Sequence, residues 1–407
     1  MKKCSLRLFL LTVLAVVFIF TGCVPAELCL RELPENPAVP VTVAALLPLT
    51  GSNRIYAEQM SKGLLCAEER INNCNGISGR KLKLEIIDTA GTAGGTREAL
   101  LTARKLGASG MIAGYDTEEV SMIIADAAKL QMPVVIPLAT SNYHMQVSPF
   151  VYRNCFSDTQ QMEALANYLL HWREIKHGAI VTDQPNDDDY SRGISRCFGM
   201  AAKDIGVSIT REVTVPKDSL LTKDQLTALL MSDPGFIMVS ARARRSAQFV
   251  RQLRQAGFSG IICGADSWDD SELCAALEGI APGECVFTSF FNAENQSAEY
   301  RQFCKRFRER FFYTPGACET QSYDALIFLA IGLDNAEDLF EFDRNWRSIA
   351  AHPGAAAVYT MLKKGEIDRT IYLKILRTVK YDKTIRSYPV LTKKLQYSKL
   401  QDYRIIE

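Results

Sequence analysis

The pattern of apolar and polar positions is clearest in residues 111–142, where two short apolar runs flank an amphipathic segment. The runs, 111–113 and 133–138, are typical of parallel strands that helices cover on both faces. Between them apolar residues recur at helical spacing, and Thr117 stands where an N-cap hydroxyl belongs, followed by two glutamates. The stretch therefore predicts a right-handed strand–helix–strand unit.

Small and polar residues follow both strands of this unit. Ligands of open α/β sheets bind at the carboxyl ends of the strands, at the point where the chain enters a loop or a helix. Thr117 follows the first strand, and Leu138, Ala139 and Thr140 end the second one. We therefore expect these four residues to contact the same small molecule.

The same alternation of strands and helices extends over most of the chain. The expected strands are 41–49, 82–88, 111–113, 133–138, 178–182, 208–215, 235–239, 260–264 and 286–290. The expected helices, besides the one after Thr117, are 55–73, 97–106, 160–171, 190–205, 223–231, 243–256, 297–312 and 322–333. Residues 359–376 are expected to form a hairpin. Two consecutive series of this kind predict an α/β protein with two doubly wound, Rossmann-like lobes.

The composition of the chain limits the class of protein but does not indicate a function. The chain has 407 residues, of which 47% are hydrophobic and 23% are charged, as in ordinary globular proteins with room for two cores. Its formal charge is +1, and without the three basic residues of the first 22 positions it would be 44 minus 46, or −2. Nothing in this balance indicates a nucleic-acid partner.

The N-terminus has the composition of a targeting signal. A basic start precedes the apolar run 8–20, which is too short to cross a bilayer comfortably, and then Thr21-Gly22-Cys23. Small residues directly before a cysteine resemble the bacterial lipobox, in which the cysteine is lipidated after cleavage. The alternative is an ordinary secretory signal or an uncleaved anchor. Residues 24–40, with four prolines, are then expected to form a short tether to the membrane surface.

The chain contains twelve cysteines, of which ten remain after Cys4 of the signal and the lipidated Cys23 are set aside. In an oxidising compartment some disulfides are expected, and Cys274 and Cys285 are the first candidates because they flank one loop. The cysteine spacing is irregular, and the four histidines form no H-x-x-x-H pattern. A zinc site is therefore not expected, and no cofactor is implied.

Two enzyme classes are considered and set aside. The sequence IIDTAG at 86–91 is similar to the D-x-x-G element of small GTPases, but no G-x-x-x-x-G-K-[ST] loop precedes it to hold phosphates. A serine hydrolase would need a G-x-S-x-G elbow and a histidine base, and the chain has no such elbow and few histidines.

The order of these signals resembles the type I periplasmic binding proteins, specifically the branched-chain amino-acid-binding proteins of ABC transporters. The most specific part is 41–88, with a strand, a P-L-T-G turn, an aromatic-bearing loop, a helix, an N-G-I-x-G-R-K-L turn and a strand that ends in Asp. PVVIPLATS, RSAQFVRQLRQAGF, GADSWDD and SYDALIFLA add weaker matches in the same order. The resemblance covers most of residues 41–378 and implies a non-enzymatic solute-binding protein.

The resemblance also implies a ligand site between the lobes, in which a zwitterion is held by both. By position, the Thr117 hydroxyl and backbone and Thr140 would bind the carboxylate, and the Leu138 carbonyl would accept from the ammonium. Asp266 would be the acidic ammonium ligand. Tyr56 and Tyr190 match aromatic wall positions, and Ala139 lies within the matched strand end.

One position departs from the family pattern. Where the family often has a second aromatic residue, after the strand at 236–239, this chain has Arg242 in the run SARARR. An arginine that faces the cleft would indicate a ligand with an additional acid or of larger size, because guanidinium pairs bidentately with carboxylate.

Simpler interpretations of the same residues stay open. Thr117 would cap a helix in any protein, and Asp266 would serve equally as the N-cap of a short helix that follows it. Tyr56 and Tyr190 are packing residues in most contexts, and the arginines at 242–245 would suit the start of a solvated helix.

The resulting expectation is an extracytoplasmic lipoprotein of the periplasm or cell surface, whose partners are a small ligand, an ABC transporter permease and, through its lipid, the membrane. A ligand-sensing lipoprotein of the same fold that signals to a membrane partner is the alternative. The expected parts are a signal peptide at 1–22, Cys23 and the tether at 23–40, and a C-terminal tail at 379–407. Lobe 1 would comprise 41–157 and about 288–352, and lobe 2 would comprise 158–287 and about 353–378, with the crossings acting as a hinge.

Overall fold

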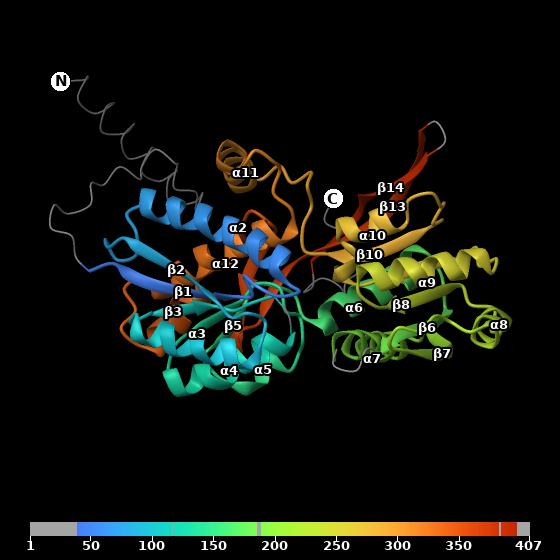
Figure 1. Ribbon diagram of the computed structural model, residues 1–407, viewed down its shortest axis with the longest axis horizontal. Helices are drawn as coiled ribbons and strands as arrows, with labels where there is room; N and C mark the ends of the chain where they lie inside the picture. The colour runs from blue at the N-terminus through green and yellow to red at the C-terminus, as the bar shows by residue number, and fades with distance from the viewer. Residues whose placement is uncertain (1–38, 116, 185–188, 382–383, 397–407) are drawn as a thin grey trace, which may run out of the picture.

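The computed structural model describes residues 39–115, 117–184, 189–381 and 384–396. It has two lobes, each built on a mostly parallel sheet with helices on both faces (Figure 1). The expected signal peptide and Cys23 lie outside the described residues. Within those residues, no helix has the length and apolar character that a membrane crossing requires.

Lobe 1 contains a five-stranded parallel sheet in the order β2-β1-β3-β4-β5. Its strands are β1 (Val41–Leu47), β2 (Leu82–Asp88), β3 (Gly110–Ile112), β4 (Val134–Ile136) and β5 (Val151–Arg153). The central strands β3 and β4 are fully buried, as their uninterrupted apolar runs predict. Strand β2, whose apolar and charged residues alternate, lies at the edge of the sheet.

The helices of lobe 1 come from both ends of the sequence. They are α2 (Arg54–Asn73), α3 (Ala93–Lys105), α4 (Thr117–Leu130), α5 (His144–Val147), α11 (Ala298–Phe311), α12 (Ala317–Leu333) and α13 (Leu339–Arg347). Helices α2 and α12 pack closely because Gly63 has no side chain, since a Cβ there would lie 2.1 Å from the Glu319 carbonyl oxygen. The C-terminal part of the chain thus returns to complete the first lobe (Figure 1).

Lobe 2 repeats the strand order of lobe 1 in its parallel part, β7-β6-β8-β9-β10. The nine-stranded sheet consists of β6 (His177–Gln184), β7 (Ser208–Pro216), β8 (Phe236–Ser240), β9 (Ile261–Gly264), β10 (Cys285–Ser289), β11 (His352–Pro353), β12 (Val358–Met361), β13 (Ile367–Tyr381) and β14 (Thr384–Gln396). Its helices are α6 (Asp158–Asn167), which continues as a π-helical segment (Tyr168–Trp172), α7 (Asp189–Asp204), α8 (Lys223–Met231), α9 (Ala243–Gln255) and α10 (Ser271–Ala276). The expected two-lobed, doubly wound α/β fold is confirmed.

Part of the segment expected to be a C-terminal tail, 379–407, belongs to the sheet of lobe 2. Residues 384–396 form β14, which pairs antiparallel with β13 over nearly its whole length. Leu395 of β14 is buried against the core, with 1% of its surface exposed. No strand was expected here because of the basic residues of this segment. An edge strand tolerates such residues, since it needs apolar residues on only one face.

Three segments connect the lobes, and a single side chain contacts all of them. Arg369, on β13, is fully buried and donates to the backbone oxygens of Asn154 and Phe290, which lie on the other two crossings. Its guanidinium also donates to Gln321 Oε1 on α12 at 2.9 Å. Because all three crossings share this group, they form one connected unit rather than three independent linkers.

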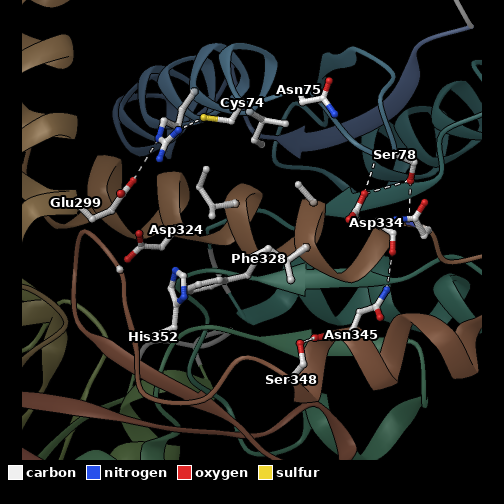
Figure 2. A pocket seen from close by; sticks show the side chains of 18 of the residues that line it. Cys74, Asn75, Ser78, Glu299, Asp324, Phe328, Asp334, Asn345, Ser348 and His352 are labelled. Atoms are coloured by element: carbon white, nitrogen blue, oxygen red, sulfur yellow. Dashed lines mark hydrogen bonds and ion pairs between the residues drawn. The ribbon is translucent and has the colours of Figure 1, made fainter. Parts of the chain in front are cut away.

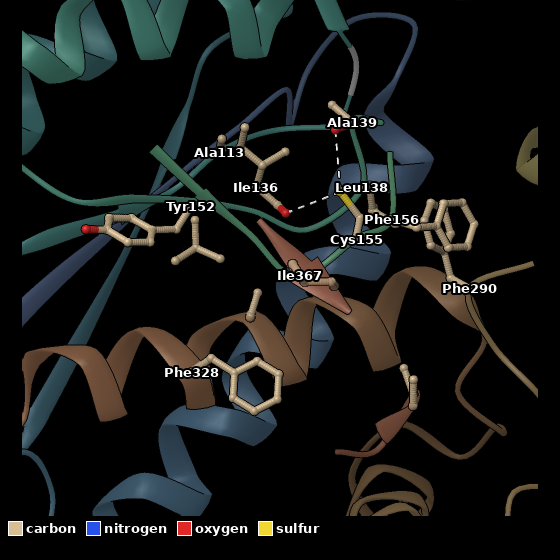
Figure 3. Packing of buried hydrophobic residues seen from close by; sticks show 14 of the residues in the cluster. Ala113, Ile136, Leu138, Ala139, Tyr152, Cys155, Phe156, Phe290, Phe328 and Ile367 are labelled. Carbon is tan, nitrogen blue, oxygen red and sulfur yellow. Dashed lines mark hydrogen bonds between the residues drawn. The ribbon is translucent and has the colours of Figure 1, made fainter. Parts of the chain in front are cut away.

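The core continues from lobe 1 into the hinge region. Figure 3 shows Phe156 stacked on Phe290, with ring centroids 4.1 Å apart, beside Cys155. The Cys155 thiol donates to the backbone oxygens of Ile136 and Ala139. The strand end that carries Ala139 is thereby fixed to the first crossing.

The expected disulfide between Cys274 and Cys285 is wrong. No two of the nine described cysteines are joined by a disulfide, and the Cys285 thiol donates instead to the Pro282 oxygen. Cys285 points into the core from β10, so the loop that separates the two cysteines does not bring their side chains together.

Candidate functional site

A cavity lies between the lobes at the carboxyl ends of their strands. Its volume is about 70 Å³, and it adjoins a cavity of about 530 Å³ that shares Thr117 and Tyr190 with it. The smaller cavity is lined by Tyr56, Tyr115, Thr117, Leu138, Ala139, Thr140, Tyr190, Arg242, Asp266, Ser267, Asp269, Asp270, Phe290, Ala317 and Cys318. All eight candidate ligand-binding residues from the sequence are in this lining.

The lobe 1 wall is built at the start of α4. Thr117 is the first residue of this helix, and its two neighbours, Glu118 and Glu119, lie in the first turn. Glu118 is exposed, whereas Glu119 is buried and accepts a hydrogen bond from the Thr89 hydroxyl. Neither glutamate lines the cavity, so the site next to Thr117 keeps the preference of a helix N-terminus for an anion.

The loop after β4 is held by a buried cation. Arg153 donates to the backbone oxygens of Thr140 and Ser141 at 3.3 and 3.1 Å. The Asp158 backbone N–H also donates to the Thr140 oxygen, at 2.9 Å. These bonds fix the backbone that carries Leu138 and Thr140 in the cavity wall.

The Thr140 hydroxyl has a partner that the sequence did not indicate. It hydrogen-bonds to the carboxyl of Asp158, and burial raises the pKa of that carboxyl to about 6, with nearby Asp266 adding to the increase. A hydroxyl donates only one hydrogen bond. The Asp158 carboxyl and a ligand would therefore compete for the hydrogen of the Thr140 hydroxyl.

On the lobe 2 side, Asp266 is fixed by two neighbours. Its Oδ1 accepts from the Tyr190 hydroxyl at 2.9 Å and from Gln161 Nε2 at 2.8 Å. Gln161 Oε1 in turn accepts from the Thr288 hydroxyl at 2.7 Å. Burial raises the pKa of Asp266, although the hydrogen bonds from Gln161 and Tyr190 favour the ionised form. Gln161, on a helix far away in the sequence, was missed.

Asp266 does not cap the helix that follows it, which was the alternative role considered for this residue. The cap of α10 is Asp270, whose side chain accepts from the Glu272 backbone N–H at 2.8 Å. Asp266 instead begins a single 3₁₀ turn, and its carboxyl faces Tyr190 and Gln161.

Two tyrosines of lobe 1 form one wall of the cavity. Tyr56 and Tyr115 are stacked, with ring centroids 4.0 Å apart and ring planes 2° from parallel. The Tyr56 hydroxyl reaches across the cavity and donates to Asp270 Oδ2 at 2.7 Å. Tyr115, which was missed, is two residues before Thr117. Because Asp270 belongs to lobe 2, this contact shows that the lobes are closed on each other.

Arg242 also belongs to the wall of this cavity. It precedes α9, and its guanidinium carbon lies 5.1 Å from the centroid of the Tyr190 ring. The next arginines have other positions: Arg244 is 77% exposed, and Arg245 pairs with Asp183 at 2.9 Å. The expectation of a solvated helix start thus fits Arg244 but not Arg242.

A larger hollow of about 890 Å³ lies on lobe 1, away from the ends of the parallel strands (Figure 2). Two of its acids, Asp324 and Asp334, are bound within the protein. Asp324 accepts from the backbone N–H groups of Ala355 and Ala356 and from the Tyr359 hydroxyl. Asp334 accepts from Ser78. The cavity between the lobes is therefore the better candidate site.

Comparisons with known proteins agree on one family. The family model described as "Periplasmic binding protein" matches residues 40–370. The Leu/Ile/Val-binding protein BraC3 of Rhizobium johnstonii is 27% identical over 259 residues, which cover 62% of this chain and 68% of that protein. The Leu/Ile/Val-binding protein homolog 3 of Brucella melitensis is 25% identical over 259 residues, with 63% and 68% covered.

Solved structures share the fold at lower identity. The leucine-binding protein LivK of Thermotoga maritima superposes with a TM-score of 0.73 at 22% identity and covers 87% of this chain and 98% of its own. The substrate-binding protein LivJ of Streptococcus pneumoniae, solved with isoleucine, has a TM-score of 0.70 at 19% identity and covers 87% and 100%.

Proposed function

The chain belongs to the periplasmic binding protein family, and from this premise we propose that it captures an amino acid between its lobes and delivers it to an ABC transporter. Members of the family bind solutes and make or break no bond, so this protein is a binding protein and not an enzyme. The relatives are named as leucine-, isoleucine- or valine-binding proteins, which supports an amino acid as the ligand class.

One observation carries the proposal. Residues that follow the ends of strands in both lobes line a single cavity, with Thr117, Leu138 and Thr140 from lobe 1 and Tyr190 and Asp266 from lobe 2. The carboxylate site comes from lobe 1, whereas the acid that would bind the ammonium, Asp266, comes from lobe 2. A zwitterion that contacts both lobes therefore stabilises the closed form over the open one.

Each half of the site suits one end of an amino acid. The first turn of α4 offers the Thr117 hydroxyl and backbone N–H groups to the ligand carboxylate. Asp266 and the Leu138 carbonyl oxygen accept from the ammonium. The hydrogen bonds of Tyr190 and Gln161 both go to Asp266 Oδ1, so Oδ2 is the oxygen that the ammonium would use.

Ligand entry needs the lobes to part. The lobes would rotate about the three crossings that Arg369 ties together, with lobe 1 as 41–157 and about 288–352, and lobe 2 as 158–287 and about 353–378. The cross-lobe contact of Tyr56 with Asp270 would break and form again in each cycle.

The test is direct. Ligand released from the purified protein by denaturation is identified by mass spectrometry, and thermal unfolding is followed with a panel of amino acids. An amino acid in the released fraction, together with a rise in the melting temperature, supports the proposal. A folded protein that neither carries nor responds to any amino acid would contradict it.

The membrane anchor is a separate part of the proposal. The sequence supports lipidation of Cys23, which would hold the protein at the membrane beside its permease and place it in the periplasm or at the cell surface. Labelling with a radioactive fatty acid tests this, with Cys23→Ser as the variant expected to lose the label. Equal labelling of the variant would contradict the lipid anchor.

A further inference from the structure

The cavity that contains the proposed carboxylate and ammonium sites has little room for a side chain. Its volume of about 70 Å³ is far below the range of about 300–1,000 Å³ that ligand pockets have. The adjoining cavity of about 530 Å³ lies within that range, and we call it the polar chamber. The two cavities share Thr117 and Tyr190, so the passage between them lies at these residues. A ligand held by its carboxylate and ammonium in the small cavity therefore extends its side chain into the polar chamber.

The linings of the two cavities differ in polarity. The small cavity has apolar walls from Leu138, Ala139, Phe290 and Ala317. Among the described residues that line the polar chamber, none is aliphatic and none is phenylalanine. Its walls consist mainly of hydroxyl, amide, carboxyl and guanidinium groups. An aliphatic side chain placed there would displace water from these groups without replacing the hydrogen bonds of that water, which lowers affinity.

The acid of the polar chamber is Asp158, at the start of α6. It is buried, with 4% of its surface exposed, and its Oδ1 accepts from Gln161 Nε2 at 3.4 Å. A carboxylate has about four acceptor sites, so it accepts a further hydrogen bond beside those from Gln161 and Thr140. Gly193 of α7 faces its other oxygen, since a Cβ on Gly193 would lie 3.3 Å from Asp158 Oδ2. The missing side chain leaves this oxygen uncovered toward α7.

The polar chamber also has a base, Arg196, on α7. It follows Gly193 by three residues and so lies on the same side of the helix. Within the part of the chain that the structure describes, no residue accepts a hydrogen bond from Arg196 or forms an ion pair with it. Its charge acts on the neighbouring Cys197 thiol, but burial raises the pKa of that thiol, which is therefore neutral and no counterion. The chamber thus offers an acceptor from α6 and a donor from α7.

The two signs of charge in the polar chamber select against a charged side chain, which would meet a like charge on one wall. An amide-type group has a carbonyl oxygen that accepts from Arg196 and an NH₂ group that donates to Asp158. Resting on the proposed function, we propose that the ligand is an amino acid with a long, uncharged side chain that ends in an amide or urea group, bound in the polar chamber between Asp158 and Arg196. These two residues then determine specificity, together with the absence of a side chain at Gly193.

The test compares side chains of similar length and different polarity. The full chain, freed of co-purified ligand, is titrated by calorimetry with L-glutamine, L-citrulline, L-leucine, L-glutamate and L-lysine. We expect glutamine or citrulline to bind ~10-fold or more tightly than leucine, glutamate and lysine, because its end group gains hydrogen bonds to charged partners.

Two pairs of variants on α7 locate the side chain. Gly193→Ala places a Cβ against Asp158 Oδ2 and should reduce the preference for the amide or urea ligand. Its control is Gly199→Ala, whose Cβ would meet Ile180 at an ordinary 3.9 Å outside the chamber. Arg196→Met should remove most of the preference over leucine, and Lys203→Met, on the same helix but outside the chamber, should retain it. Both alanine substitutions remove a helix-interior glycine, so the helix itself is not weakened.

The outcomes separate the two proposals. If leucine binds as tightly as glutamine and citrulline, or if glutamate or lysine binds most tightly, the uncharged polar ligand is overturned and the amino-acid-binding function stands. If Gly193→Ala or Arg196→Met keeps the full preference, the placement of the side chain in the polar chamber is overturned. If the folded wild-type chain binds no amino acid, the proposed function fails and this inference fails with it.

Discussion

The Tyr56 hydroxyl donates a hydrogen bond of 2.7 Å to Asp270 Oδ2 and so joins the lobes across the cavity. Tyr56 is held in place for this contact by its stack on Tyr115. The closed form is therefore stabilised by a direct contact between the two lobes, in addition to the contacts that a ligand makes with both of them.

Tyr56→Phe is expected to shift the protein toward the open form. The change keeps the stacked ring and removes one hydrogen bond, worth about 0.5–1.5 kcal/mol, from the closed state. Ligand affinity should fall ~2- to 12-fold, and small-angle scattering of the ligand-free protein should give a larger radius of gyration. Tyr313→Phe is the control, since its hydroxyl contacts Glu319 within lobe 1. Unchanged scattering and affinity would contradict this role.

Asp266→Asn is expected to weaken amino-acid binding by ~1.5–3 kcal/mol, the size of a hydrogen bond to a charged group. Calorimetry measures this loss, and unchanged affinity would sink the assignment of Asp266 as ammonium ligand. The wild-type affinity should also depend on pH. Burial raises the pKa of Asp266, and only the ionised form binds an ammonium, so affinity should fall as the pH is lowered through that raised value. The variant should lack this part of the pH dependence.

Asp158→Asn is expected to make the stability of the protein depend less on pH between pH 4 and pH 8. Burial raises the pKa of Asp158 from 3.8 to about 6 in the folded state, so folding favours the protonated form. The stability that this group contributes is present at low pH and is lost as the pH rises through about 6. The difference in unfolding free energy between the variant and the wild type should therefore shift in favour of the variant by about 1–3 kcal/mol when the pH is raised from 4 to 8. Denaturant unfolding at both pH values measures this, and a constant difference would contradict it.

Most of the fold could be predicted because it depends on local periodicity. The run 223–231 was assigned as a helix with the bounds that α8 has, since the Thr222 cap and the apolar spacing act within one segment. Strand β14 could not be predicted in this way. Its sequence alternates with basic residues and contains Pro389, and it is a strand because β13 offers it a pairing edge.

The candidate site was predictable to the extent that its residues follow strand ends. The segment GADSWDD, which pointed to Asp266, also carries Asp269 and Asp270, but their partners could not be inferred. Gln161 and Tyr56 reach their acids from elements 105 and 214 residues away. Such contacts depend on how the lobes pack, so they cannot be predicted from the local pattern of apolar and polar residues.

Arg369→Met is expected to destabilise the whole protein rather than the ligand site alone. The change removes a charged donor that the oxygens of Asn154, Phe290 and Gln321 share. The Asn154 oxygen keeps a hydrogen bond from the Gln321 amide, and Gln321 Oε1 keeps one from the Tyr359 hydroxyl. A hydrogen bond from a charged group contributes about 1.5–3 kcal/mol, so we expect the loss of this group to lower the free energy of unfolding, measured in denaturant, by about 3–5 kcal/mol. Arg377→Met, an exposed position on the same strand, is the control and should change stability by less than about 0.5 kcal/mol. A similar small effect for both variants would contradict the hinge role.

The cysteines give a final prediction, because the sequence and the structure disagree about them. The structure has no disulfide between any two of the nine described cysteines, and burial raises the pKa of Cys285 to about 12, which makes it a poor nucleophile. We therefore expect a strong reductant to leave the melting temperature unchanged, whereas loss of a native disulfide would cost about 2–5 kcal/mol. Thiol labelling under non-reducing conditions should be slow for Cys285 in the native protein and fast in denaturant. A fall in melting temperature on reduction, or a Cys285 that stays unlabelled in denaturant, would show that it is paired after all.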